Sequence, residues 1–352
     1  MEAATYKGTN KMLVGIVFSV LTFWLFAQTL VNLIPEVQSD LGLNLNTINI
    51  AISLTPLFSG MFVAVSGGLA DQLGRKKITY VGLVLSIIGS LFLALSNGAT
   101  LFIVGRVLQG LSAACIMPAT ISLVKEYFDG EERQRAVSFW SIGSWGGMGM
   151  TSFVGGAIAT YMGWRWIFIF SIILAFIAMI LIKEVPESKA KEEGKFTFDY
   201  LGLLLFILSM IGLNVYITQG SLIGWFSPLA ISLLIIFIVG TALFIRYELV
   251  KKNPLIHMKL FKNRTYTGAV LANFFLNGAA GTIIVANTYV QVGRGFTPFQ
   301  SGMLSLGYLI AVLTMIRVGE KLMQKLGAKK PMIWGAGSTL IGVLCMTLTF
   351  FI

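Results

Sequence analysis

Charged side chains are scarce in this sequence of 352 residues, of which only 12% are Asp, Glu, Lys or Arg. A soluble domain usually carries about a quarter charged residues. The hydrophobic share of 56% leaves too little polar surface to cover a water-soluble core. Disorder is excluded as well, because the chain is rich in Leu, Ile, Val and Phe. The composition therefore predicts a membrane protein.

Cysteine and histidine are nearly absent: Cys115 and Cys345 lie within apolar runs, and His257 lies in a basic loop. These three residues form no pattern for a disulfide framework or a metal site. The sequence also has no Walker phosphate loop, no His-Glu-x-x-His pair and no nucleophile elbow. We therefore expect no metal, no cofactor and no enzymatic activity.

Long uncharged runs recur along the whole chain, and a transmembrane helix needs about 20 such residues. The 46 uncharged residues between Asp199 and Arg246 are too many for one crossing, and Gln219, Gly220 and Gly224 supply a turn within them. We predict an all-α polytopic protein with 11 transmembrane helices, at 12–34, 48–70, 78–95, 101–124, 136–161, 166–182, 200–218, 227–245, 266–290, 298–316 and 331–352. An odd number of spans that stops in mid-run is typical of a chain that has been cut short.

Basic residues fall between these runs in an alternating way. If the N-terminus is cytoplasmic, 23 of the 26 Lys and Arg residues lie in inside segments, as the positive-inside rule requires. The exceptions are Arg106 within the fourth span, and Arg165 and Arg294 in outer loops. The net charge of +11 thus indicates topology rather than a nucleic-acid partner. We expect a multi-pass protein of the plasma or inner membrane with a cytoplasmic N-terminus.

The loop after the second span is the most specific motif. It reads Gly-Gly-Leu-Ala-Asp-Gln-Leu-Gly-Arg-Lys-Lys over residues 67–77. Small residues such as Gly67 and Gly74 let helix ends approach closely, and Asp71 can meet a helix N-terminus or an arginine such as Arg75. We predict that these four residues form a latch that holds one conformation.

This string resembles the signature between helices two and three of the major facilitator superfamily. Arg106-Val-Leu-Gln109-Gly110 is similar to that superfamily's helix-four motif, and residues 319–330 resemble a degenerate second copy of the loop. Span five carries Gly143, Gly147 and the pair Gly155-Gly156, as in antiporters of the family, but it has Thr and Ser where the family has Gly-Pro. These glycines are also explained by helix packing alone.

The fourteen-helix drug:proton antiporter branch fits best. Its traits include Trp164-Arg-Trp-Ile-Phe and the Phe198-Asp199-x-x-Gly202 sequence that opens an inserted helix pair. Against fourteen helices, this chain lacks the last three. The resemblance implies an N-terminal six-helix bundle over 1–183, a linker with the inserted pair over 184–252, and a partial C-terminal bundle of three helices over 253–352.

Arg106 is an ionisable residue inside a span, which makes it a functional candidate by default. It must face the protein interior and find a partner. The family often places an Asp near the end of the first span, where this sequence has Ala27. Glu36 and Asp40 are the nearest carboxylates, four residues apart and on one helix face. We predict that they carry protons and that Arg106 responds to their charge, although both acids are also explained as solvated groups at a helix end.

Substrate recognition is assigned to polar and aromatic side chains within the spans. Buried amides need partners, and tryptophans bind flat or cationic compounds through stacking and cation–π contact. The same amides could instead bond one another across helices, and membrane aromatics often face lipid. The predicted substrate-binding residues are Gln28, Asn32, Gln109, Trp145, Asn273 and Asn277, with Asn287 as a further candidate on span nine.

The favoured hypothesis is a proton-coupled multidrug exporter that carries aromatic or cationic organic compounds by alternating access. Its partners would be these compounds, protons and the lipid bilayer. One alternative is an uptake symporter of the same fold. Another is a truncated, transport-inactive membrane fragment or partner-binding subunit. The sequence indicates neither the compounds nor the oligomeric state.

Overall fold

The computed structural model describes residues 6–190, 199–252 and 254–349, and no strand occurs among them. The first eight α-helices and three shorter π and 3₁₀ elements are α1 (Asn10–Leu21), η1 (Thr22–Ala27), η2 (Leu30–Asn32), α2 (Ile34–Leu41), α3 (Leu45–Leu73), α4 (Arg75–Ala94), α5 (Ala99–Tyr127), α6 (Gly130–Ser141), η3 (Ile142–Gly146), α7 (Gly147–Met162) and α8 (Arg165–Ile182). The remaining elements are α9 (Tyr200–Ile223), α10 (Pro228–Val250), η4 (Met258–Lys262), α11 (Arg264–Arg294), α12 (Pro298–Leu304), α13 (Leu306–Leu326) and α14 (Lys329–Thr349).

Within the described ranges, nine helices are long and apolar enough to cross a membrane, and the pair α12 and α13, bent by 43°, adds a tenth. The remaining predicted span, 136–161, lies in α6, η3 and α7, which run without a non-helical break from 130 to 162. All eleven predicted segments are therefore helical over most of their described residues, with interruptions at single positions such as Leu33 and Ser305. The prediction of an all-α polytopic protein is confirmed.

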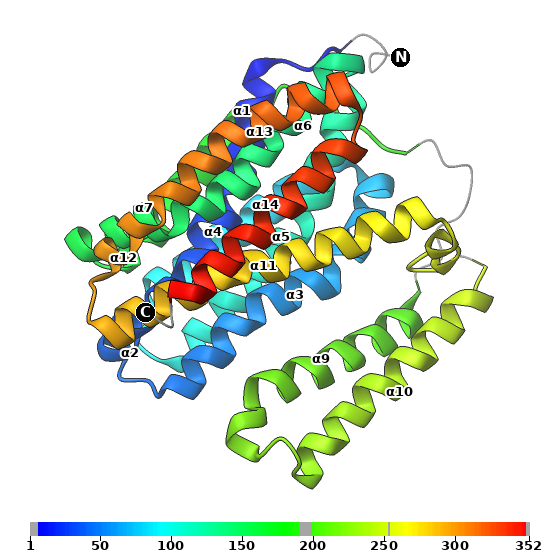
Figure 1. Cartoon of the computed structure of the whole chain (residues 1–352). Coiled ribbons are helices and arrows are strands. Elements are labelled where there is room, and N and C mark those ends of the chain that lie inside the picture. Colours follow the sequence, from blue (N-terminus) through cyan, green and yellow to red (C-terminus); the bar gives the residue numbers. More distant parts are fainter. Residues whose placement is uncertain (1–5, 191–198, 253, 350–352) are drawn as a thin grey trace.

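Three groups of helices can be followed in Figure 1. In the first, α5 packs against α3 and α4, while α8 packs against α1 and α4. In the second, α9 and α10 pack against each other and, through α9, against α3 at one side of the molecule. In the third, α13 lies along α6 and α7, α12 packs on α7, and α14 contacts α11 and α13. The domain boundaries at 183 and 252 stay a prediction.

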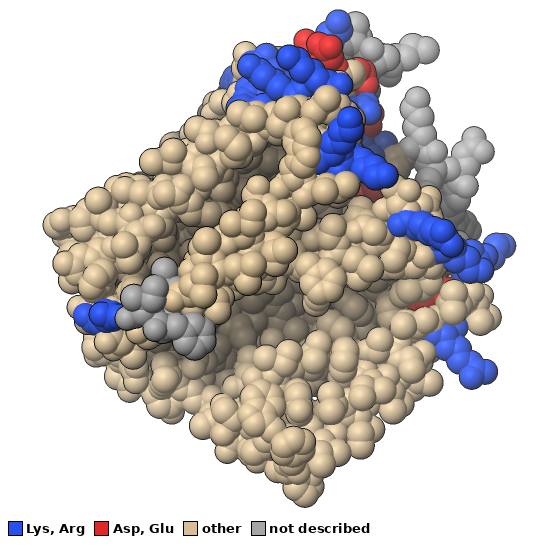
Figure 2. Space-filling view, in the orientation of Figure 1, with Lys and Arg blue, Asp and Glu red and all other residues tan. Residues whose placement is uncertain are grey.

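Lys and Arg gather at one end of the bundle, which Figure 2 shows along the upper and right edges of the molecule. We call this the basic end; it contains the turn between α3 and α4 and the ends of α5 and α8. At the opposite, far end, Arg165 donates to the Ser96 carbonyl oxygen at 2.8 Å and forms an ion pair with Asp40. The far end therefore ties together α2, α8 and the turn between α4 and α5.

Candidate functional site at the basic end and at Arg106

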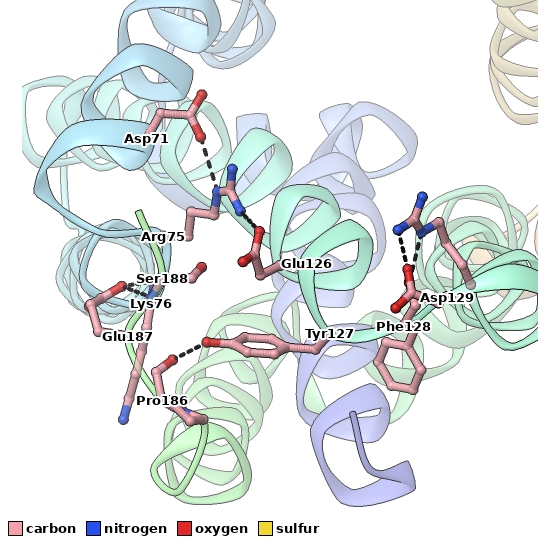
Figure 3. A network of polar contacts seen from close by, with 11 residues as sticks. Asp71, Arg75, Lys76, Glu126, Tyr127, Phe128, Asp129, Pro186, Glu187 and Ser188 are labelled. Carbon is pink, nitrogen blue, oxygen red and sulfur yellow. Dashed lines mark hydrogen bonds and ion pairs between the residues drawn. The ribbon is translucent and has the colours of Figure 1, made fainter. Parts of the chain in front are cut away.

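Two predicted latch residues, Asp71 and Arg75, meet Glu126 at the turn between α3 and α4 (Figure 3). Arg75 Nε donates to Asp71 Oδ1 at 3.0 Å, and Arg75 NH1 donates to Glu126 Oε2 at 2.7 Å. One guanidinium thus joins the end of α3, the start of α4 and the last turn of α5. Half-exposed ion pairs contribute about 1 kcal/mol or less each, so the network fixes geometry more than it adds stability.

A second contact in the same network caps the N-terminus of α4 from outside (Figure 3). Glu187 follows α8 and accepts from the Lys76 backbone N–H at 2.8 Å and from the Lys77 backbone N–H at 3.0 Å. The first N–H groups of a helix have no partner within the helix and favour a negative charge. Nearby, the Ala190 N–H donates to the Asp71 carbonyl oxygen at 2.8 Å. The segment after α8 is therefore bound to both sides of the latch turn.

Of the two predicted latch glycines, Gly74 occupies a position that requires glycine. Gly74 has φ +123° and ψ 132°, a conformation that L side chains avoid, and an added Cβ would collide with the Glu187 carboxylate. Gly67 lies in ordinary contact distance of Pro118 on α5, with 3.5 Å between a built Cβ and the proline Cβ. Gly74 thus shapes the latch, whereas Gly67 only packs beside α5.

Sequence reasoning missed Glu126 and Glu187, which supply the carboxylates on either side of Arg75 and α4. Each left a signal. Glu126 lies in the last turn of a helix that ends at the basic end. A negative charge there is unfavourable with the helix dipole, so a nearby cation is expected. Glu187 follows Pro186 directly after a span, in a loop that carries both Lys and Glu. The available indication was that this loop and the basic turn at 75–77 lie on the same predicted side of the membrane.

Arg106 is the largest fully buried side chain and has no exposed surface. Its NH1 group donates to the Ala27 carbonyl oxygen at 2.6 Å and to Gln109 Oε1 at 2.8 Å, and its NH2 group donates to the Ile52 carbonyl oxygen at 3.3 Å. The expectation that it faces the interior is confirmed. Within 6–190, 199–252 and 254–349, no carboxylate lies within 4.0 Å of it.

The first span supplies a backbone carbonyl for this cation because its helix is irregular. A π-helix covers Thr22–Ala27 and a 3₁₀ turn covers Leu30–Asn32, so the regular hydrogen-bond pattern is interrupted around Ala27. Such π segments are frequent at functional sites. The Ala27 carbonyl oxygen takes the place beside Arg106 that the resemblance assigned to an Asp side chain.

Glu36 and Asp40 share α2, as predicted, but the structure does not bring either acid to Arg106. Asp40 forms an ion pair with Arg165 and accepts from Trp164 Nε1 at 3.1 Å. Glu36 is half-buried, and within the described part of the chain its buried Oε2 has no hydrogen-bond partner. Burial raises the pKa of Glu36 above its ordinary value. The coupling of these acids to Arg106 stays a prediction.

The predicted substrate residues divide between two places. Gln109 is buried on Arg106, Asn32 is buried in η2, and Gln28 and Trp145 are half-buried in the interrupted first and fifth spans. Asn273 and Asn277 are exposed on α11, where Asn277 Nδ2 donates to the Asn273 carbonyl oxygen at 2.8 Å. The first four thus lie buried or half-buried in the first, fourth and fifth spans, whereas the two asparagines lie on an exposed face of α11.

Asn287 joins two helix groups instead of standing free. Its Nδ2 donates to Ser152 Oγ on α7 at 2.8 Å, and its Oδ1 accepts from Ser301 and Ser305 at 3.2 and 3.3 Å. Beside it, a Cβ on Gly156 of α7 would lie 2.5 Å from the Pro298 carbonyl oxygen of α12. The glycine-rich fifth span therefore makes a close, hydrogen-bonded contact with α11 and α12, as helix packing explains.

The whole of this architecture matches one protein family. A model described as Major Facilitator Superfamily matches residues 12–352. The chain belongs to the major facilitator superfamily. Membership makes it a multi-pass membrane transporter, in agreement with the family and class that the loop and helix-four motifs indicated.

Curated relatives extend over nearly all of the chain. The Quinolone resistance protein NorB of Staphylococcus aureus strain Newman is 56% identical over 345 residues, which are 98% of this chain and 74% of that protein. The NorB of strain MRSA252 is 55% identical over 346 residues, 98% of this chain and 75% of its own length.

Solved structures share the fold at low identity. A POT family transporter in complex with a thioalcohol conjugated peptide has a TM-score of 0.61 at 15% identity, over 91% of this chain and 70% of its own. A peptide transporter POT in complex with sulfate has a TM-score of 0.57 at 15% identity, over 92% and 72%. At this identity the likeness concerns the fold alone.

Proposed function

We propose that this major facilitator is a proton-coupled exporter of flat aromatic or cationic organic compounds, with quinolones among them. The observation that carries the proposal is the 56% identity, over 98% of the chain, to a quinolone resistance protein. The fully buried Arg106 supports the coupling to protons, because a cation held only by neutral oxygens responds strongly to any carboxylate that approaches it. Glu36 and Asp40 are the proposed proton carriers.

The transport cycle would alternate between two arrangements of the helix groups. The latch of Asp71, Arg75, Glu126 and Glu187 stabilises one arrangement by tying α3, α4, α5 and the segment after α8 together. Major facilitators work by rocking one helix bundle against the other around a fixed site. Breaking the latch would release the basic end for that motion. Gln28, Asn32, Gln109 and Trp145 are proposed to contact substrate in the first bundle.

We further propose that the basic end, and with it the N-terminus, faces the cytoplasm. The clustering of Lys and Arg at one end supports this orientation. Tags placed after Arg75 and after Lys262 would then be protected from reagents outside the cell. Labelling of both tags in intact cells would contradict the orientation.

The test of function uses everted vesicles with an imposed inside-acid pH and a fluorescent quinolone as probe. Accumulation that collapses with the pH gradient is expected of the wild type, whereas inward coupled flux in right-side-out vesicles would indicate an uptake symporter. Arg106→Ala, Glu36→Gln and Asp40→Asn should each reduce proton-driven accumulation. Glu132→Gln, at an exposed acid on α6, is the matched control and should transport normally. Unchanged transport in all three test variants would remove the site assignment.

A further inference from the structure

Two carboxylates meet at the base of the inserted helix pair, outside the proposed transport site. Asp199 lies directly before α9 and is 4% exposed, and Glu248 lies in the last turn of α10 and is 2% exposed. The sequence separates them by the whole helical hairpin. Buried acids are rare unless they are paired or protonated, so their environment must account for both.

Each carboxylate is satisfied on one oxygen only. Asp199 Oδ1 accepts from the Gly202 N–H at 2.9 Å and from Lys251 Nζ at 3.2 Å, and Glu248 Oε2 accepts from the Ile256 N–H at 2.7 Å. The other oxygens, Asp199 Oδ2 and Glu248 Oε1, are buried and have no hydrogen-bond donor among the residues that the structure describes. If a Cβ were added to Gly202, these two oxygens would be its nearest neighbours. Two unpartnered acceptors therefore face one small space, which the absence of a side chain at Gly202 keeps open.

A proton is the ligand that fits this space. Two acceptors facing each other in a buried site repel when both are ionised, and a proton shared between them converts the repulsion into a short, strong hydrogen bond. A metal ion is disfavoured because the Lys251 ammonium already contacts Asp199 and no third acidic, His or Cys ligand joins the pair within the described residues. Burial acts to raise the pKa of Asp199, but its hydrogen bonds from Gly202 and Lys251 outweigh that effect and lower it. The proton therefore belongs on Glu248.

We propose that the Asp199–Glu248 pair binds one proton from the aqueous phase, with the Glu248 O–H group donating to Asp199 Oδ2. The other charged or titratable groups around the pair are Lys251, which bonds Asp199 and the Tyr247 hydroxyl, and the exposed His257 just beyond Ile256. The bound proton ties the end of α10 to the start of α9, while the other Glu248 oxygen holds the segment that leads to η4. This site is distinct from Glu36, Asp40 and Arg106.

Loss of the proton has a structural consequence next to the pair. A cavity of about 490 Å³ lies between α9, α10 and η4, and Ile256 lines it together with Phe206, Phe244, Leu249 and Phe261. Ile256 is also the residue whose N–H holds Glu248. When both carboxylates are ionised, their repulsion separates the helix ends and weakens the contact with Ile256. Deprotonation should therefore loosen the wall of this cavity.

Infrared difference spectroscopy of the purified chain in lipid nanodiscs tests the proposal by pH titration. We expect a protonated-carboxyl band in the wild type at neutral pH that is lost on alkaline titration, and that is missing in Glu248→Gln. In Glu248→Gln the side-chain amide can still donate to Asp199. Glu320→Gln is the matched control, because Glu320 is a buried acid on α13 that is already paired with Arg317, and it should keep the band.

Hydrogen exchange at the Ile256 amide provides a second readout on the same samples. After correction for the intrinsic pH dependence of exchange, wild-type protection should fall by tenfold or more as the band is lost, and Glu248→Gln should stay protected. A wild type without the band, a band that persists in Glu248→Gln, or wild-type protection independent of pH overturns the proposal. The wild-type titration decides the matter even where a variant fails to fold. Neither readout depends on transport.

Discussion

Gly74→Ala is the substitution for which the structure gives the sharpest expectation. The residue has φ +123°, so any L side chain there is strained by about 1–3 kcal/mol. The added methyl group also enters the space of the Glu187 carboxylate and displaces it from the Lys76 and Lys77 backbone N–H groups. Removing an anion from a partly exposed helix N-terminus costs about 1 kcal/mol more.

These terms together disfavour the latched conformation by about 2–4 kcal/mol. Since 1.4 kcal/mol is a factor of ten in an equilibrium, the ratio of latched to unlatched molecules should fall roughly 30- to 700-fold. A fall of this size would convert a mostly latched population into a mostly unlatched one. Transport should slow, because one of its two alternating conformations is depleted.

Electron–electron distance measurements between spin labels at Lys77 and Lys189 would follow the latch directly. Both positions are exposed and lie on the two sides of the Glu187 contact. The labels require a background in which the free Cys115 and Cys345 are replaced by serine. The wild type should give one short, narrow distribution, and Gly74→Ala a longer and broader one.

Gly68→Ala is the matched control, because a Cβ at Gly68 meets no described residue within 4 Å and the φ of Gly68 is not positive. It should leave the distances unchanged. Equal distributions in Gly74→Ala and wild type, or equal broadening in both glycine variants, would refute the reasoning from φ and from the Glu187 contact.

Two further predictions concern stability. Asn287→Ala should lower the free energy of unfolding by about 1–3 kcal/mol, because it leaves the buried Ser152, Ser301 and Ser305 without their shared partner. Thermal unfolding in detergent measures this change. As a control, Asn277→Ala at an exposed position should change the free energy of unfolding by less than about 0.5 kcal/mol. Glu36 has a pKa raised by burial, so the folded protein holds this proton more tightly than the unfolded chain, and stability should decline as pH rises above 4.5 through the raised pKa. Glu36→Gln should flatten that part of the profile, and an unchanged slope would contradict the assignment.

The fold was predictable because lipid imposes simple rules on sequence. Runs of about 20 apolar residues can only be helices there, since every backbone group must be satisfied within its own segment. What the runs could not indicate is how a helix deviates within a span. The π segments Thr22–Ala27 and Ile142–Gly146 and the 43° bend between α12 and α13 have no consistent mark in an apolar sequence. Tertiary contacts decide such irregularities.

The candidate sites were predictable only in part, for a related reason. Asp71 and Arg75 are only four residues apart, on the two sides of the turn at Gly74, so their pairing is a local contact. Glu126 and Glu187 reach the same turn from 51 and 110 or more residues along the chain, through the packing of α5 and α8. No spacing rule covers such distances. The Asp199–Glu248 pair is of the same kind, formed by the antiparallel return of α10 along α9.

In the proposed proton coupling, the missing carboxylate at position 27 would change the energetics at Arg106 rather than abolish its role. The oxygens of Ala27, Gln109 and Ile52 accept from its NH1 and NH2 groups. Within the described residues its Nε–H has no partner and no carboxylate compensates its charge. An ionised carboxylate that came within 4 Å would gain about 4 kcal/mol at an effective dielectric constant near 20, which is close to a thousandfold in an equilibrium. The half-buried Glu36 has one oxygen without a hydrogen-bond partner in the described ranges, and only the turn at Leu33 separates it from the first span. If its deprotonation draws α2 toward α5, the proton alone selects the conformation. A fixed ion pair to an Asp at position 27 would instead satisfy Arg106 in both states and weaken that selection.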